Sequence, residues 1–112
     1  MMIALMKQPI YGNSAEYADN RLSLFSAQWS KCAVTGIEFS SLNEIHCHHI
    51  VPRHCGGDDS YGNLMLLREP VHKLIHATQA DTIAKYLSIL QLNPSQIAKV
   101  NSLRLKAQLS EL

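Results

Sequence analysis

Residues 47–76 read CHHIVPRHCGGDDSYGNLMLLREPVHKLIH, and this stretch decides the fold. The segment EIHCHHIV at 44–51 is short and contains β-branched residues, which predicts a strand that ends near His49. Prolines and glycines throughout 52–62 predict a loop, and NLMLL predicts a second strand after it. PVHKLIHAT at 70–78 predicts a helix with a proline in its first turn. The predicted order is therefore strand, loop, strand, helix.

A helix is predicted before this core, over residues 13–30. Asn13 and Glu16 have the spacing of an N-cap and its N3 partner. An apolar stripe at helical spacing follows, made of Leu22, Phe25 and Trp29. The next segment, KCAVTGIEF, indicates a turn at Thr35-Gly36 between short extended pieces.

Two further helices are predicted after the core. The first, over 81–92, is amphipathic, and its inward residues are Ile83, Tyr86, Leu87 and Leu90. The second begins at the cap Asn93, with Pro94 at N1 and Gln96 at N3, and its apolar face is Ile97, Val100, Leu103 and Ala107. No repeat or long linker divides the chain, so we expect a single α+β domain over 1–112 with its core at 44–79.

All six histidines fall within residues 46–76. Histidine titrates near neutrality and is the commonest metal ligand, so this clustering indicates a chemical site. His72 and His76 are four residues apart and therefore share one helix face. An isolated H-x-x-x-H pair is most often made of ordinary polar or core residues, so the spacing alone does not decide. The zinc-protease motif needs a glutamate where this chain has Lys73, which excludes that class.

The first histidine cluster strengthens the metal interpretation. A strand hairpin packed on the helix brings either His48 or His49 to the helix pair, which makes a site of three imidazoles. Three protein ligands leave positions open for water or substrate, as in catalytic metal sites. The other histidine of the pair faces differently along the strand and is available as a base.

The stretch 47–76 resembles the HNH endonuclease motif, which forms the ββα-metal fold. The matching elements are His48-His49, Gly56-Gly57, Asp59, Asn63-Leu64, His72 and His76. The segments before and after it, from Pro9 to Arg104, are similar to the C-terminal endonuclease domain of group II intron reverse transcriptases. The resemblance implies a ββα-metal core with one N-terminal and two C-terminal flanking helices, and it implies a metal-dependent DNA endonuclease.

The resemblance also implies a role for each matching residue. His48, His72 and His76 would bind one divalent metal ion, and His49 would be the general base. Asn63 would brace the loop and help to orient His49. Products with 5′-phosphate and 3′-hydroxyl ends are implied. Imidazole ligands suit zinc, nickel or manganese better than magnesium, whereas cellular availability favours magnesium, so the working ion stays open.

The structural zinc site of many HNH proteins is not matched in this sequence. They hold a structural zinc with two C-x-x-C pairs, but here only Cys32 matches a ligand, and the other three positions are Thr35, Arg68 and Val71. We therefore predict no structural zinc. Cys47 is expected to be a small buried strand residue that points away from His48, and Cys55 a plain loop residue.

Four residues near the motif have weaker interpretations. Arg53 and Lys73 are the nearest candidates for phosphate contacts. His46 shares a strand face with His48, so it is either structural or a spare or supporting ligand, and His54 either touches phosphate or is solvated. Gly56-Gly57 either lets the DNA backbone approach or only makes a turn.

Composition limits the classes of protein. Of 112 residues, 46% are hydrophobic and 17% charged, which is typical of an ordered globular protein. No apolar run is long enough for a membrane span, the N-terminus does not resemble a secretory signal, and three cysteines do not make a disulfide scaffold, so we expect a cytoplasmic protein.

The net charge is only +1, so a targeting protein or RNA is an expected partner beside DNA. The alternatives are a catalytically inactive nucleic-acid-binding module of the same fold, a partner-dependent nuclease, and a metal-stabilised interaction domain.

Overall fold

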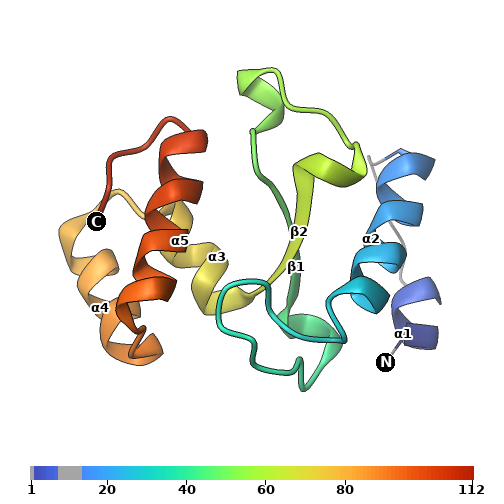
Figure 1. Ribbon diagram of the computed structural model, residues 1–112, viewed down its shortest axis with the longest axis horizontal. Helices are drawn as coiled ribbons and strands as arrows, with labels where there is room; N and C mark the ends of the chain where they lie inside the picture. The colour runs from blue at the N-terminus through green and yellow to red at the C-terminus, as the bar shows by residue number, and fades with distance from the viewer. Residues whose placement is uncertain (1, 8–13) are drawn as a thin grey trace.

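The computed structural model describes residues 2–7 and 14–112 (Figure 1). A two-stranded hairpin lies at the centre, with two helices on one side and three on the other. The elements are α1 (Met2–Lys7), α2 (Ala15–Ala27), β1 (Ile45–His49), β2 (Leu64–Arg68), α3 (Glu69–His76), α4 (Ala80–Leu90) and α5 (Pro94–Lys106). Three short 3₁₀ turns cover Leu42–Glu44, Arg53–Cys55 and Tyr61–Asn63. The α+β class and its ββα core are as predicted.

The two faces of the hairpin carry different residues, one face toward α2 and the other toward α3. β1 and β2 are antiparallel, with His48 opposite Met65 and His49 opposite Leu64. Side chains alternate along a strand, so His48 faces α3 and His49 faces α2. β2 contributes side chains to both layers, and its Leu66 is fully buried.

The outer edge of β2 is paired by the segment that follows α2. The Gln28 side chain accepts a hydrogen bond from the Leu66 N–H and donates one to the Leu66 carbonyl, each at 3.0 Å. The Ala33 N–H also donates to that carbonyl, at 3.1 Å. These bonds satisfy backbone groups that an uncovered edge would leave open, and they fix α2 against the hairpin.

The loop between the strands closes tightly on itself. Pro52 is buried, and Gly56 has a left-handed φ of 94°. A Cβ atom on Gly57 would lie 1.7 Å from the Val51 carbonyl oxygen and 2.9 Å from the Asn63 Nδ2 atom. Only glycine fits at 57, because the backbone of Val51 and the side chain of Asn63 leave no room for a Cβ atom. The glycine pair therefore makes the turn.

α3 follows β2 without a break, and Pro70 lies in its first turn as predicted. Its inner face is Val71, Leu74 and Ile75, all 0% exposed, and burial of each such side chain contributes about 1.5–3 kcal/mol. The helix ends at His76, two residues earlier than predicted. Both strands, α4 and α5 contact this short helix.

Arg104 of α5 holds the end of α3. Its Nη1 donates to the carbonyl oxygens of Leu74, Ile75 and Ala77, at 2.9, 3.2 and 2.7 Å. The side chain is 3% exposed, and the last turn of a helix otherwise lacks donors for its carbonyls. α5 itself starts at the predicted capping box of Asn93 and Gln96.

α4 and α5 match their predicted faces. The four residues predicted to point inward from α4 pack partly buried against the core, and Val100 and Leu103 of α5 are buried in it. Gly36 has a φ of 70° and turns the chain between Lys31 and Glu38, which form an isolated antiparallel bridge. The predicted turn at Thr35-Gly36 is thus confirmed.

The first predicted helix differs in its ends. Asn13 lies outside the described residues, and the N-cap is Ser14, whose Oγ accepts from the Tyr17 N–H at 3.0 Å. The helix stops at Ala27, and Trp29 has a φ of 55° and is 81% exposed. The prediction that Trp29 continues the apolar stripe is wrong, because the left-handed turn rotates it away from the core.

α1 is tied to α2 by a buried arginine: the Arg21 Nη2 atom donates to the Leu5 carbonyl at 2.9 Å. Among the described residues, no helix has the length and apolar character needed to cross a membrane.

Candidate active site

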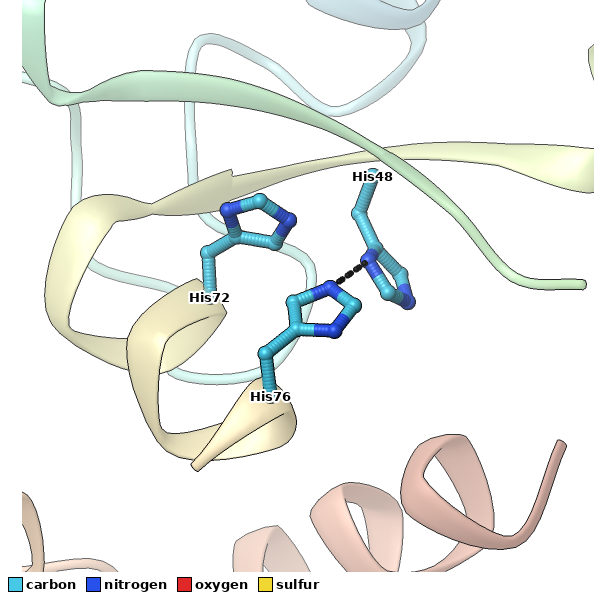
Figure 2. Close-up of side chains that lie close together, drawn as sticks. All are labelled: His48, His72 and His76. Carbon is cyan, nitrogen blue, oxygen red and sulfur yellow. Dashed lines mark hydrogen bonds between the residues drawn. The ribbon is translucent and has the colours of Figure 1, made fainter. Parts of the chain in front are cut away.

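Three histidines converge between β1 and α3 (Figure 2). His72 and His76 project from consecutive turns of α3, and His48 projects from β1 toward them. One ring nitrogen from each lies within 4.8 Å of the others. The ring centroids are 4.7 to 5.2 Å apart. The three residues predicted as metal ligands are therefore brought together.

All three imidazoles are held neutral. Burial, together with the nearby His76 and His49, lowers the pKa of His48 to about 4. Burial also lowers the pKa of His72 to about 3, with added effects of His48 and His76. The pKa of His76 is lowered by burial and by the charge of Arg104. The neutral imidazole is the form that binds metal ions, so the site is ready for a cation near pH 7.

The spacing of two of the three donor atoms fits one shared ion. The His76 Nε2 and His48 Nδ1 atoms are 3.3 Å apart. In a tetrahedral site with metal–nitrogen bonds of about 2.0–2.1 Å, neighbouring donor atoms lie roughly 3.3 Å apart. The buried Nε2 of His48 has no hydrogen-bond partner among the described residues, so packing rather than a second bond holds this ring. Three nitrogen donors suit a borderline ion such as zinc or nickel.

His46 lies beside this group and not within it. Its ring centroid is 5.2 Å from that of His72, on the same face of β1 as His48. Its nitrogen atoms are not among the three that converge. The contact places His46 as a support for the His72 ring.

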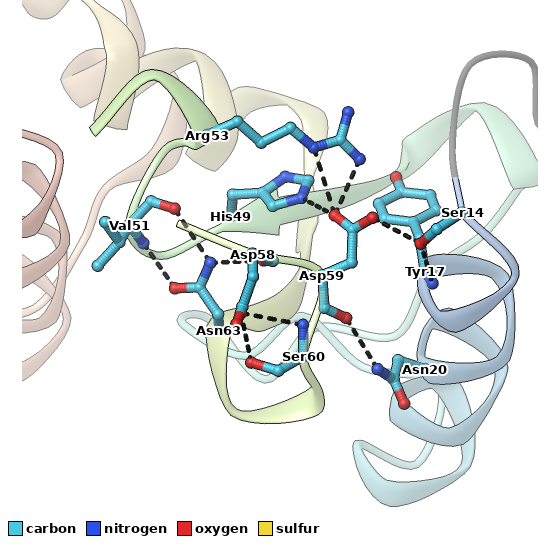
Figure 3. A network of polar contacts seen from close by, with 10 residues as sticks. All are labelled: Ser14, Tyr17, Asn20, His49, Val51, Arg53, Asp58, Asp59, Ser60 and Asn63. Carbon is cyan, nitrogen blue, oxygen red and sulfur yellow. Dashed lines mark hydrogen bonds and ion pairs between the residues drawn. The ribbon is translucent and has the colours of Figure 1, made fainter. Parts of the chain in front are cut away.

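His49 points to the other face of β1, toward α2 (Figure 3). Its Nε2 atom is 2.8 Å from Asp59 Oδ1. The Tyr17 ring stacks on the His49 ring, with centroids 5.7 Å apart and planes 13° apart. The His49 ring is therefore fixed on two sides, by an acceptor at its nitrogen and by an aromatic face.

The histidine group and His49 meet at one cavity. The cavity is open to solvent and has a volume of about 320 Å³. Its lining residues are Cys47, His48, His49, Pro52, Arg53, His54, His72 and His76. A group bound there would contact both the proposed metal ligands and the proposed base.

Asn63 braces the loop and does not touch His49. Its Oδ1 accepts from the Val51 N–H at 2.8 Å, and its Nδ2 donates to the carbonyls of Val51 and Asp58 at 3.0 and 2.8 Å. Its own carbonyl accepts from the Ile50 N–H at 2.8 Å. Asn63 thus joins both ends of the loop, and any effect on His49 passes through the backbone.

Asp59 is the direct partner of His49, although only its place in the motif was noted from the sequence, without a role. Ser14 Oγ donates to its Oδ2 at 2.6 Å, and Arg53 Nη2 donates to its Oδ1 at 2.9 Å. Hydrogen bonds from Ser14, His49 and Arg53 hold the pKa of the Asp59 carboxyl far below its usual range. The carboxylate is therefore ionised, and it accepts from all its partners.

The two predicted phosphate-contacting residues border the histidine group from different sides. Arg53 lines the cavity that contains His49, and its side chain is 48% exposed. Lys73 is exposed and lines a second cavity of about 420 Å³, which His46, His72, His76 and Ala77 complete.

Cys47 and Cys55 lie where the sequence predicts, except that Cys47 is half-buried and not buried. Cys47 is half-buried in β1 on the face opposite His48, and it hydrogen-bonds with Tyr17. Cys55 is exposed in the loop, and Cys32 is buried, where its Sγ accepts from the Arg68 N–H at 3.4 Å. All three are free thiols.

Fold and site together define a ββα histidine site, and comparison with known families agrees. Residues 29–77 match the family model described as HNH endonuclease. The match spans the hairpin, α3 and the whole histidine group, and it leaves α2, α4 and α5 outside. The segment 29–77 is therefore similar to HNH endonuclease domains. No curated protein and no solved structure matches the chain.

Proposed function

We propose that the protein is a metal-dependent DNA endonuclease that hydrolyses phosphodiester bonds. In this proposal His48, His72 and His76 bind one divalent ion, and His49 is the general base. The observation that carries it is the single cavity lined by the neutral histidine group on one side and by His49 on the other. The HNH match over the same residues supports it.

The base chemistry follows from a neutral imidazole beside a bound phosphate. His49 takes a proton from water while the water oxygen forms a bond to phosphorus. The bond from phosphorus to the 3′-oxygen breaks, and that oxygen takes a proton from solvent. The products carry 5′-phosphate and 3′-hydroxyl ends. A positioned base of this kind contributes typically about 10²–10⁴-fold to the rate.

A divalent ion bound by the three histidines would stabilise the charge that develops on the phosphate and on the leaving oxygen. The donor set suits zinc, nickel or manganese on ligand softness, and magnesium is the most available alternative in cells. Arg53 and Lys73 would contact the backbone phosphates on either side of the cleaved bond.

DNA targeting is expected to need help. The net charge of the chain is +1, so its field attracts DNA weakly. We propose that a partner protein or an RNA supplies affinity and sequence specificity inside the cell. The similarity of the flanking segments to group II intron endonuclease domains suggests an RNA partner, and no matched relative supports that link. Retention of the protein on intron RNA would test it.

The alternative function is a nucleic-acid-binding module without catalysis. The four histidines of the proposed mechanism are all in place and share one cavity, which favours the enzyme. Loss of only one of them would leave a module that binds and does not cut. Cleavage assays separate the two classes.

Plasmid cleavage by the purified protein tests the proposal. It is measured with EDTA and with added magnesium, manganese, nickel or zinc, beside His49→Ala. Metal-dependent nicking that is lost in His49→Ala, with plasmid and metal binding retained, is the expected result. Plasmid binding without cleavage under every ion favours the binding module, and cleavage that persists in His49→Ala removes His49 as the base.

A further inference from the structure

The Asp59 carboxylate dictates which nitrogen of His49 carries a proton. An ionised carboxylate only accepts hydrogen bonds, and Asp59 Oδ1 lies 2.8 Å from His49 Nε2. Nε2 of His49 therefore carries a proton and donates it to this carboxylate. A neutral imidazole carries one ring proton, so the lone pair that can accept a second one is on Nδ1.

Asp59 is itself held from two directions. Ser14 Oγ donates to Oδ2 at 2.6 Å, and the Asn20 side chain donates to the Asp59 carbonyl at 2.9 Å. Arg53 reaches Oδ1 through Nη2 at 2.9 Å and through Nε at 3.3 Å. Together with His49, four residues thus donate hydrogen bonds to Asp59, and they hold its carboxylate in one position (Figure 3).

The support comes from α2, which lies outside the segment that matches the HNH family. Ser14 caps this helix, Asn20 lies in it, and Tyr17 from its first turn stacks on the His49 ring. The family-matched segment begins only at residue 29. The N-terminal helix therefore completes the surroundings of His49, beyond its contribution to the core.

We infer that Asp59, held in place by α2 and Arg53, is a positioning residue for His49. It fixes the ring orientation and the Nε2–H tautomer, and it leaves Nδ1 as the atom that accepts the proton. This inference rests on the proposed endonuclease function. The arrangement matches a general rule: a histidine acts from one nitrogen while a partner at the other fixes its tautomer.

The test combines Asp59→Ala with the conservative variant Asp59→Asn. Asp59→Ala removes the acceptor, whereas asparagine keeps one acceptor oxygen within reach of His49. Asp58→Ala is the matched control, because it removes the neighbouring carboxylate, which bonds to Ser60 and not to His49. Cleavage is measured as kcat and KM, metal affinity by calorimetry, and the ring nitrogens of His49 by ¹⁵N–¹H correlation at pH 8, before and after zinc is added.

The expected result is a kcat for Asp59→Ala about 10–100-fold below that of the wild type, the range for loss of a partner that orients a histidine. KM and metal affinity stay unchanged, Asp59→Asn recovers part of the rate, and Asp58→Ala cleaves like the wild type. The wild-type spectrum shows a proton on Nε2 of His49, and Asp59→Ala shows a mixture of tautomers.

Two results would overturn the inference while the proposed function stands: wild-type cleavage rates in Asp59→Ala, or a wild-type His49 with its proton on Nδ1. If the wild type does not cleave under any ion, the proposed function fails. The spectrum alone then decides whether Asp59 sets the tautomer, with Nε2–H in its favour and Nδ1–H against it.

Discussion

His48 and His49 are neighbours in the chain and lie on opposite faces of β1, with His48 against α3 and His49 against α2. Because side chains alternate along a strand, a proposed metal ligand and a proposed base can occupy different surroundings. His48 is 1% exposed and grouped with two other neutral imidazoles. His49 has an ionised carboxylate as its partner. Two consecutive residues can serve as ligand and base because each meets a different helix.

The buried histidines predict how stability depends on pH. Burial lowers the pKa of His48 and His72 to about 4 and about 3, whereas in the unfolded chain histidine titrates at about 6.5. Below about pH 6.5 the unfolded chain gains protons that the folded one does not take up, so stability is complete above that pH and falls as pH decreases toward 4.

We therefore expect the melting temperature of the metal-free protein to fall steadily from pH 7 to pH 4.5. The variant His72→Gln, which removes one of these groups, should show a smaller fall. The folded form brings His48, His72 and His76 together, so it should bind zinc more tightly than the unfolded form, and saturating zinc should raise the melting temperature at pH 7. A melting temperature that rises on acidification, or a steeper fall in His72→Gln, would contradict the assignment.

The loop between the strands offers a matched pair of glycines. A Cβ on Gly57 would overlap the Val51 carbonyl, whereas a Cβ on Gly62 meets nothing within 4 Å. We expect Gly57→Ala to destabilise the fold by about 2–4 kcal/mol, because the backbone must move and the bonds of Asn63 stretch. Gly62→Ala should stay within about 0.5 kcal/mol of the wild type. Urea unfolding measures both free energies. Equal losses in the two variants would show that Gly57 does not lie tightly against the Val51 carbonyl.

Thiol reactivity tests the burial of Cys32 and Cys47 and the exposure of Cys55, independently of any metal. The thiolate is the reactive form, and burial raises the pKa of the Cys47 thiol to about 11. Cys32 is 2% exposed, and Cys55 is exposed. Ellman's reagent at pH 8 should therefore give one fast thiol, which Cys55→Ser removes. A fast phase that survives in Cys55→Ser would mean that Cys47 or Cys32 is more accessible than the fold allows.

The sequence predicted the parts of the site that depend on local pattern. The period of a strand separates His48 from His49, and the period of a helix pairs His72 with His76, so both relationships can be read from spacing. The hairpin, α3 and the capping box of α5 follow from equally local signals. The converging histidines need only one further assumption, that the hairpin packs on the helix.

The partner of His49 could not be predicted in this way. Ser14 and Asp59 are 45 residues apart, and they meet only because α2 packs along the hairpin. Neither residue has a periodicity that points to the other. The prediction for Trp29 was wrong for a different reason. Helical spacing extends to it, but the helix ends at Ala27 and the backbone then turns left-handed. Tertiary packing sets the contact between Ser14 and Asp59, and a left-handed turn after the helix sets the exposure of Trp29.

Arg104 links the C-terminal helix to the histidine group, and the consequence is measurable. It donates to three carbonyls at the end of α3, and His76 is the last residue of that helix. Arg104→Met keeps much of the buried volume and removes the side-chain donor from the Ile75 and Ala77 carbonyls, whereas the Leu74 carbonyl keeps the Ala77 N–H at 3.3 Å. We expect a loss of about 2–4 kcal/mol in the free energy of unfolding, because each buried polar group left unpaired costs about 1–3 kcal/mol.

The same variant should weaken metal binding, since the last turn of α3 would no longer hold His76 in place. We expect zinc affinity to fall by about 10–100-fold, as for loss of a residue that orients a ligand. Lys106→Met is the control, because Lys106 is an exposed cation in the last turn of α5. Calorimetry with zinc, together with urea unfolding, checks both effects. If Arg104→Met loses stability and keeps full zinc affinity, α5 supports the fold without positioning His76.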